Sequence, residues 1–129
     1  MTRINLVPLD ELEREFIQGE YKEIIRVFNL VKKAQSKNKT PNDIDAPTKY
    51  KLGSGHVKFF YDKLLFVVKR YEQLTEKMIE LGYKPNPISR EELLEGIDDH
   101  WLNDYIPSDE EISISKSRLN ERRQELGMK

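Results

Sequence analysis

The first residues, Met1-Thr2-Arg3, place a small residue directly after the initiator methionine. Removal of Met1, which is usual in such a context, would expose the α-amine of Thr2 as the new N-terminus. A free α-amino group has a pKa of about 7.7–8.0, against about 10.4 for a lysine side chain. A sizeable fraction is therefore unprotonated near neutral pH, and an unprotonated amine can form an imine with an electrophilic carbon. Thr2 is accordingly the candidate nucleophile.

A carboxylate and two cations lie close together a little further along the chain. Lys22 and Arg26 are four residues apart, so in a helix they share one face, and Glu23 lies beside them at the edge of an apolar stripe. A single helix-surface carboxylate is ordinarily inert. The spacing alone therefore gives Glu23 no catalytic role.

Hydrophobic periodicity predicts three main helices that must position these groups. The first runs from an N-cap at Asp10 to about 33 or 36, with a possible irregularity at Gly19, and the second runs over 58–81 and stops at Gly82. The third runs from a capping box at Ser108 and Glu111 to about 124. The residues expected to face inward are Ile24, Val27, Phe28, Val31, Phe60, Leu64, Val67, Val68, Tyr71, Leu74, Met78 and Leu81.

The segments between these helices are rich in turn-forming residues or carboxylates. Residues 37–57, including Gly53-Ser54-Gly55, are predicted to form loop and turn, and a short helix is predicted around 91–95. Strand signals are weak throughout. We therefore expect an all-α fold, a compact single domain over 1–129 with three main helices and long loops.

The charge distribution is more informative than the net charge of −1. Residues 91–111 hold nine carboxylates and no Lys or Arg, which leaves 22 cations against 14 anions in the other 108 residues. A basic body is what a nucleic-acid-binding protein needs. Arg118 and Arg122 contribute to it from one face of the third helix, one turn apart.

The sequence also argues against several classes of site. There is no cysteine, so disulfides and thiolate chemistry are excluded. His56 and His100 lack metal-ligand spacing and are expected to be structural or surface residues, so we expect no metal and no organic cofactor. No apolar run approaches the ~20 residues of a membrane span, and no signal peptide is apparent. The expected location is cytoplasmic, in a bacterial or phage-infected cell.

Five segments together resemble one family over nearly the whole chain, to about Arg123. The chain resembles the pyrimidine-dimer DNA glycosylase/AP lyase family, the endonuclease V of T-even phages. The segments that carry the resemblance are Thr2 to Leu6, Glu20 to Glu23 with Arg26-Val27-Phe28, the block LGSGHVKFFYDKL at 52–64, DYIP at 104–107, and Arg118-Leu119 followed by Arg122.

The resemblance implies a role for each candidate residue. In the family the threonine amine at Thr2 is the nucleophile, and the glutamate at Glu23 is the catalytic carboxylate. The family also implies that the base opposite the lesion is flipped out of a sharply bent duplex. The cations that match its DNA-binding positions are Arg3, Lys22, Arg26, Arg118 and Arg122.

The chain departs from the family pattern at several places. Lys22 replaces an arginine, Glu15-Phe16 replaces a Gln-His pair, Ile25 replaces a proline, and an aromatic C-terminal tail is missing. The resemblance therefore supports catalysis better than preference for one lesion.

We expect a monomeric repair enzyme that excises pyrimidine dimers from damaged double-stranded DNA and cleaves the strand at the resulting abasic site. Two alternatives stay open. One is the same imine chemistry on other base lesions or on abasic sites alone. The other is a non-catalytic DNA-binding protein on the same scaffold.

Overall fold

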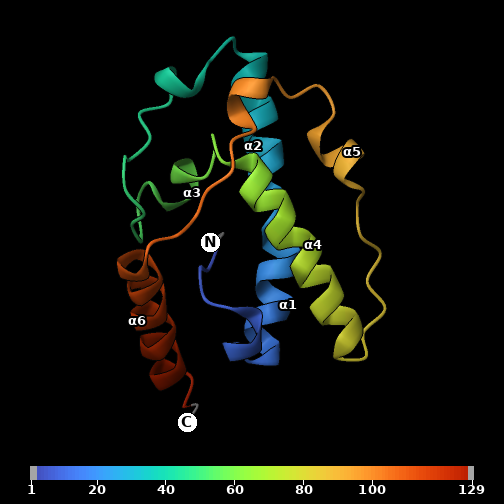
Figure 1. The fold of residues 1–129 in the computed structure, drawn as a ribbon, viewed down its shortest axis with the longest axis vertical. Helices are drawn as coiled ribbons and strands as arrows, with labels where there is room; N and C mark the ends of the chain where they lie inside the picture. The colour runs from blue at the N-terminus through green and yellow to red at the C-terminus, as the bar shows by residue number, and fades with distance from the viewer. Residues whose placement is uncertain (1–2, 128–129) are drawn as a thin grey trace.

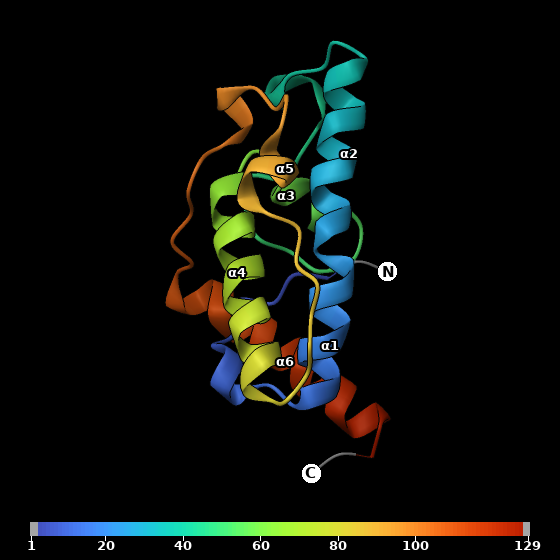
Figure 2. The same ribbon diagram turned by 90° about the vertical axis from the view of Figure 1, so that its right-hand side faces the viewer.

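The computed structural model describes residues 3–127, which form helical rods joined by long loops (Figures 1 and 2). The predicted all-α class is confirmed: these residues contain no β-strand, only an isolated antiparallel bridge between Lys63 and Leu102. The α-helices are α1 (Arg14–Glu23), α2 (Ile25–Ser36), α3 (His56–Phe59), α4 (Leu64–Glu80), α5 (Arg90–Leu94) and α6 (Asp109–Glu125). Short 3-10 turns lie at Leu9–Glu11, Pro41–Asp43 and Asp99–Trp101.

The first rod consists of α1 and α2, which run almost end to end in Figure 2. The chain is helical through Gly19, so the predicted irregularity there is wrong, and the interruption falls at Ile24. Ile24 keeps helical dihedral angles (φ −60°, ψ −31°). Its carbonyl accepts a 3.2 Å hydrogen bond from the Val27 amide, three residues on instead of four, as in a 3-10 turn. The rod therefore changes its hydrogen bonding without a large change of direction.

The predicted N-cap at Asp10 is also wrong, because α1 begins only at Arg14. Asp10 lies in a separate 3-10 turn, and the chain is extended at Leu12 and Glu13 before the helix starts. The Glu13 carboxylate makes no cap bond and instead accepts a 2.6 Å hydrogen bond from Arg123 Nε of α6. Burial of Leu12 and this ion pair account for the later start.

The predicted helix over 58–81 is divided into α3 and α4. In a continuous helix the Phe59 carbonyl would accept the Lys63 amide four residues on. Here it accepts the Lys63 ammonium at 3.0 Å, while the Lys63 amide bonds to the Phe60 carbonyl at 2.9 Å. The Lys63 ammonium also lies 4.0 Å from the centre of the Phe59 ring, a cation–π contact that favours the break.

The remaining predicted elements are close to the structure. Ser108 and Glu111 form the predicted capping box, with bonds of 3.1 and 3.0 Å, and α6 then extends to Glu125. The short acidic helix is α5, and Gly82 ends α4 with a left-handed φ of +93°. His56 is buried and hydrogen-bonded and His100 is exposed, as expected of structural and surface histidines.

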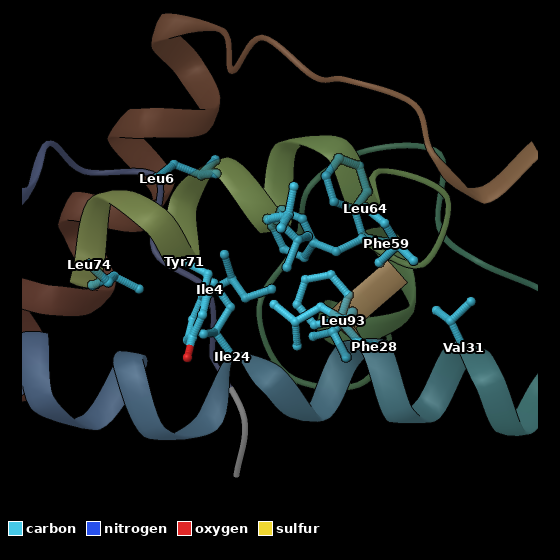
Figure 3. Close-up of a cluster of buried hydrophobic side chains, with 14 of the residues drawn as sticks. Ile4, Leu6, Ile24, Phe28, Val31, Phe59, Leu64, Tyr71, Leu74 and Leu93 are labelled. Carbon is cyan, nitrogen blue, oxygen red and sulfur yellow. The ribbon is translucent and has the colours of Figure 1, made fainter. Parts of the chain in front are cut away.

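One hydrophobic cluster extends from Ile4 to Leu119 and fills the space between the rods. Figure 3 shows Ile4 between α4 and the rod of α1 and α2, among Ile24, Phe28 and Tyr71. All the residues predicted to face inward are buried except Leu81, which is half-buried. The N-terminal segment is thus part of the core.

Candidate active site

A cavity of about 390 Å³ lies where the N-terminal segment, α1 and α6 meet. We call it the arginine cavity, because each wall is charged and three of its residues are arginines. It is lined by Arg3, Asn5, Glu15, Phe16, Gly19, Glu20, Glu23, Arg118, Leu119 and Arg122. Residues more than 110 positions apart therefore form one site.

Gly19 keeps the α1 wall of the cavity open. A Cβ built on Gly19 meets no atom within 4 Å, so the residue faces empty space. Glycine inside a helix costs roughly 1 kcal/mol relative to alanine. Gly19 has ordinary helical dihedral angles, so the backbone does not require glycine. A side chain at this position would extend into the cavity that Gly19 lines.

Three guanidinium groups converge on the cavity. Burial lowers the pKa of Arg3 from its ordinary value, and the neighbouring charges of Arg118 and Arg122 lower it further. Tyr50 and the carboxylate of Glu125 raise this pKa in opposition, and Glu125 also forms a 2.9 Å ion pair with Arg122. Three crowded cations attract an anion, and the arginine fork matches the paired oxygens of a phosphate or a carboxylate.

Arg118 has an unsatisfied donor at this place. Its Nη1 atom is buried and has no hydrogen-bond partner among residues 3–127. The closest carboxylates are those of Glu125 and Glu121, at 3.7 and 3.9 Å, beyond hydrogen-bonding range. A buried unpaired guanidinium donor costs free energy unless a ligand supplies the acceptor.

Beneath the cavity, a buried polar network fixes α1 to α4 and to the N-terminal segment. Arg70 Nε donates to Glu20 at 2.6 Å, Arg70 Nη1 donates to the Val7 carbonyl at 2.9 Å, and Asn5 donates to Glu20 at 2.8 Å. Glu20, Arg70 and Asn5 are all buried. Glu20 is thus neutralised by a partner, whereas Glu23, one turn away on the same cavity, forms no ion pair with another described residue.

The structure brings together four of the seven residues predicted from the sequence. Arg3, Glu23, Arg118 and Arg122 line the arginine cavity. Lys22 and Arg26 do not line it, but lie exposed on the same rod next to Glu23. Thr2 lies outside the described residues, and it directly precedes Arg3 in the chain.

Two further cations on this rod are candidate DNA-binding residues that the sequence alone did not indicate. Lys33 and Lys37 follow Arg26 by seven and eleven residues, spacings that return to the same helix face. We call Lys22, Arg26, Lys33 and Lys37 the basic stripe: all four are exposed, and none forms an ion pair with another residue in the range 3–127. At its far end, a hollow of about 310 Å³ adds Lys39 and Lys58. The 3.6-residue period of the lysines was the signal that could have revealed the stripe.

The described residues form neither of two other classes of site. In the part of the chain that the structure describes, no three His, Asp or Glu side chains are grouped as metal ligands would be. The same residues contain no helix with the length and apolar character of a membrane span.

A sequence model of the family described as pyrimidine dimer DNA glycosylase matches residues 1–91. The match covers the N-terminal segment, Glu23 and the basic stripe, and it ends before α6, which contributes Arg118 and Arg122. Because the match includes well over half of the chain, this protein belongs to the pyrimidine dimer DNA glycosylase family.

Proposed function

We propose that the protein excises pyrimidine dimers from duplex DNA and then cleaves the strand by a coupled AP lyase reaction through an imine on Thr2. The observation that supports this most strongly is that Glu23 shares one cavity with three arginines, one of which is the residue next to Thr2. Consecutive Cα atoms are about 3.8 Å apart. An amine at Thr2 is therefore tied to the cavity by the chain itself.

The proposed chemistry begins with attack of the unprotonated Thr2 amine on C1′ of the damaged nucleotide. The glycosidic bond breaks and its electron pair leaves with the base, while Glu23 stabilises the positive charge that develops on the sugar. The amine then loses a proton and the sugar ring opens, which gives an imine at C1′.

Strand cleavage follows from the imine, which acidifies the proton at C2′. Glu23 mediates removal of that proton, and the C3′–O bond breaks with its electron pair leaving on the phosphate. Water then hydrolyses the imine and returns the free amine. One site thus breaks the glycosidic bond and the 3′ phosphodiester.

The DNA is held by its phosphates in this proposal. Arg3, Arg118 and Arg122 would bind phosphates at the lesion, and the basic stripe would bind the flanking backbone. The stripe spans about 22 Å at 1.5 Å per residue, which corresponds to roughly six base pairs at 3.4 Å each. A nucleotide flipped out of the stack would give the amine access to the sugar.

A second candidate is the same chemistry on other lesions. Glu15 and Phe16, where the sequence departs from the family pattern, both line the arginine cavity. These two departures therefore lie where a lesion would be recognised, while Glu23, Arg3, Arg118 and Arg122 match the family positions.

The test is borohydride trapping on two duplexes, one carrying a pyrimidine dimer and one carrying an abasic site. We expect a covalent adduct on both, mapped to Thr2. Thr2→Ser keeps a small residue after Met1, so it still yields a free α-amine and should retain trapping. An uncleaved N-terminal extension should abolish trapping and leave DNA binding intact. An adduct on Lys22 or another lysine would refute the mechanism, and trapping on the abasic duplex alone would favour the second candidate.

A further inference from the structure

The backbone of the N-terminal segment is hydrogen-bonded by side chains from distant parts of the chain. It belongs to no strand, so its buried amides and carbonyls need other partners. The Ile4 amide donates to His56 Nε2 at 2.9 Å, and the Ile4 carbonyl accepts from Tyr50 Oη at 3.4 Å. The Leu6 amide donates to Ser115 Oγ of α6 at 3.0 Å.

The contacts of His56 determine its protonation state. Its Nδ1 lies 2.9 Å from the Lys51 carbonyl, which can only accept, so Nδ1 carries the proton. Its Nε2 therefore keeps the lone pair that accepts the Ile4 amide. Both ring nitrogens are used, and the arrangement holds only while the imidazole is neutral.

The surroundings of His56 favour the neutral form. The side chain is only 3% exposed, and the rings of Tyr50 and Phe60 pack edge-on against it at 5.4 and 5.5 Å. Burial lowers the pKa of His56, opposed by the Lys51 carbonyl. Of the charged groups, Arg3 lowers this pKa further and Glu20 raises it.

We propose that His56 is a positioning residue for imine formation, which fixes the backbone two residues from the Thr2 amine through the Ile4 amide. This inference rests on the proposed function. The Ile4 amide is two residues from the Thr2 amine, so few rotatable bonds separate the anchored group from the proposed nucleophile. Arg3, the residue between them in the chain, has its side chain on the cavity wall. Displacement of a reacting group by about 1 Å can cost 10²-fold in rate.

Protonation would release this anchor. An imidazolium presents an N–H at both nitrogens, so the Ile4 amide would face a donor instead of an acceptor. The folded-state pKa lies below the ordinary value, so the anchor is complete above about pH 6.5 and is lost as the pH falls through the folded-state pKa. The Thr2 amine is also protonated over this range, so two protons should oppose the reaction at acid pH.

The test compares His56→Gln, His56→Ala and a control, Leu93→Ala, which alters the core in α5. Glutamine can still accept from the Ile4 amide, and alanine cannot. We measure the single-turnover rate of borohydride trapping at saturating abasic duplex, at a temperature where circular dichroism shows each variant folded. We expect His56→Ala to be at least about tenfold slower, within the range that misplacement costs, with the Kd for DNA nearly unchanged. His56→Gln and Leu93→Ala should remain near the wild-type rate.

The pH profile provides the second measurement and needs no alanine variant. In a plot of the logarithm of the trapping rate against pH, the wild-type slope should rise from one toward two as the pH falls below about 6.5 through the folded-state pKa of His56. The slope for His56→Gln should stay at one. Equal slopes, or a folded His56→Ala variant that traps at the wild-type rate, would overturn the positioning role and leave the proposed function standing. Wild-type protein that is never trapped through Thr2 would instead overturn the proposed function.

Discussion

At the scale of single residues, three carboxylates line the arginine cavity, and two of them should behave differently. Glu20 is paired with Arg70, whereas Glu15 and Glu23 form no ion pair with another described residue. Only Glu23 matches the catalytic position that the family resemblance implies. Each carboxylate places a negative charge where a phosphate would pass, so each should weaken DNA binding slightly.

We predict that Glu23→Gln lowers base excision by about 10²–10⁴-fold, the contribution of a positioned acid–base group, with DNA binding retained. Glutamine cannot stabilise the sugar cation or carry the elimination proton. The matched control, Glu15→Gln, removes the same charge from the same cavity but restores the glutamine of the family pattern, so it should keep excision within a few-fold. Gel-based excision assays and DNA titrations decide this, and excision by Glu23→Gln at the Glu15→Gln level would remove Glu23 from the mechanism.

At this scale the sequence is most informative where the family resemblance supplies the residues. The resemblance indicates Arg3, Glu23, Arg118 and Arg122, and these four residues meet at one cavity. From the sequence, a glycine inside a helical stretch predicts only a possible irregularity at Gly19, which the structure does not have. Its role in the cavity wall depends on which face of α1 meets α6, and that is decided by tertiary packing.

At the scale of elements, Gly19 allows stability and activity to be separated. Gly19→Ala should stabilise the protein by roughly 0.5–1 kcal/mol, since its Cβ meets no atom within 4 Å and alanine is the better helix former. Gly19→Leu should keep the fold but project into the cavity and reduce DNA cleavage. Thermal unfolding and cleavage rates measured on both variants provide the check, and full activity in Gly19→Leu would mean that substrate does not enter this space.

The basic stripe along α1 and α2 makes a prediction about salt. If Lys33 and Lys37 bind phosphates, the double variant Lys33→Gln/Lys37→Gln should flatten the dependence of log affinity on log salt by about 0.9 for each lost contact. Lys84→Gln, an exposed lysine beyond the end of α4, is the control and should leave the slope unchanged. Binding to undamaged duplex is measured across a series of salt concentrations. An unchanged slope in the double variant would place the flanking DNA elsewhere.

The helix boundaries show what periodicity alone can and cannot predict. Apolar spacing predicted the inward faces of α2 and α4 almost completely, because burial follows the 3.6-residue period. The 3.6-residue period does not predict the break at Ile24. The family pattern marks it, because the family has proline at Ile25, the first residue of α2, and proline is favoured at the first position of a helix. The break before α4 depends on the Lys63 ammonium taking a backbone carbonyl, which no local pattern encodes.

At the scale of the whole molecule, the acidic segment 91–111 runs from α5 to the first turn of α6, which carries Asp109, Glu110 and Glu111. In Figure 1, α5 and the start of the acidic segment lie on the side opposite to α6. Among residues 3–127, Asp104 is the only carboxylate of the 91–111 segment that forms an ion pair, with Lys69 at 2.7 Å. A molecule with little net charge can therefore still orient itself toward DNA, because the field at each face follows the local charges.

The buried network of Glu20, Arg70 and Asn5 is the second whole-molecule feature, and removing one charged partner from it should be costly. We predict that Arg70→Met destabilises the fold by about 3–5 kcal/mol, because it leaves the Glu20 carboxylate buried without its partner. The double variant Glu20→Gln/Arg70→Met removes that stranded charge and should recover part of the loss. Urea unfolding measures both, and a double variant no more stable than the single would show that lost packing, not the charge, is responsible.

The attachment of the Leu6 amide to Ser115, 109 residues later, also has a consequence for biosynthesis. The N-terminal segment is synthesised before α6, but α6 closes the cavity and holds that segment. Under the proposed function, a nascent chain without α6 would carry the Thr2 amine without the site that directs it toward DNA. Synthesis of α6 would then be the step that completes the site, and fragments that stop before α6 should not cleave abasic DNA.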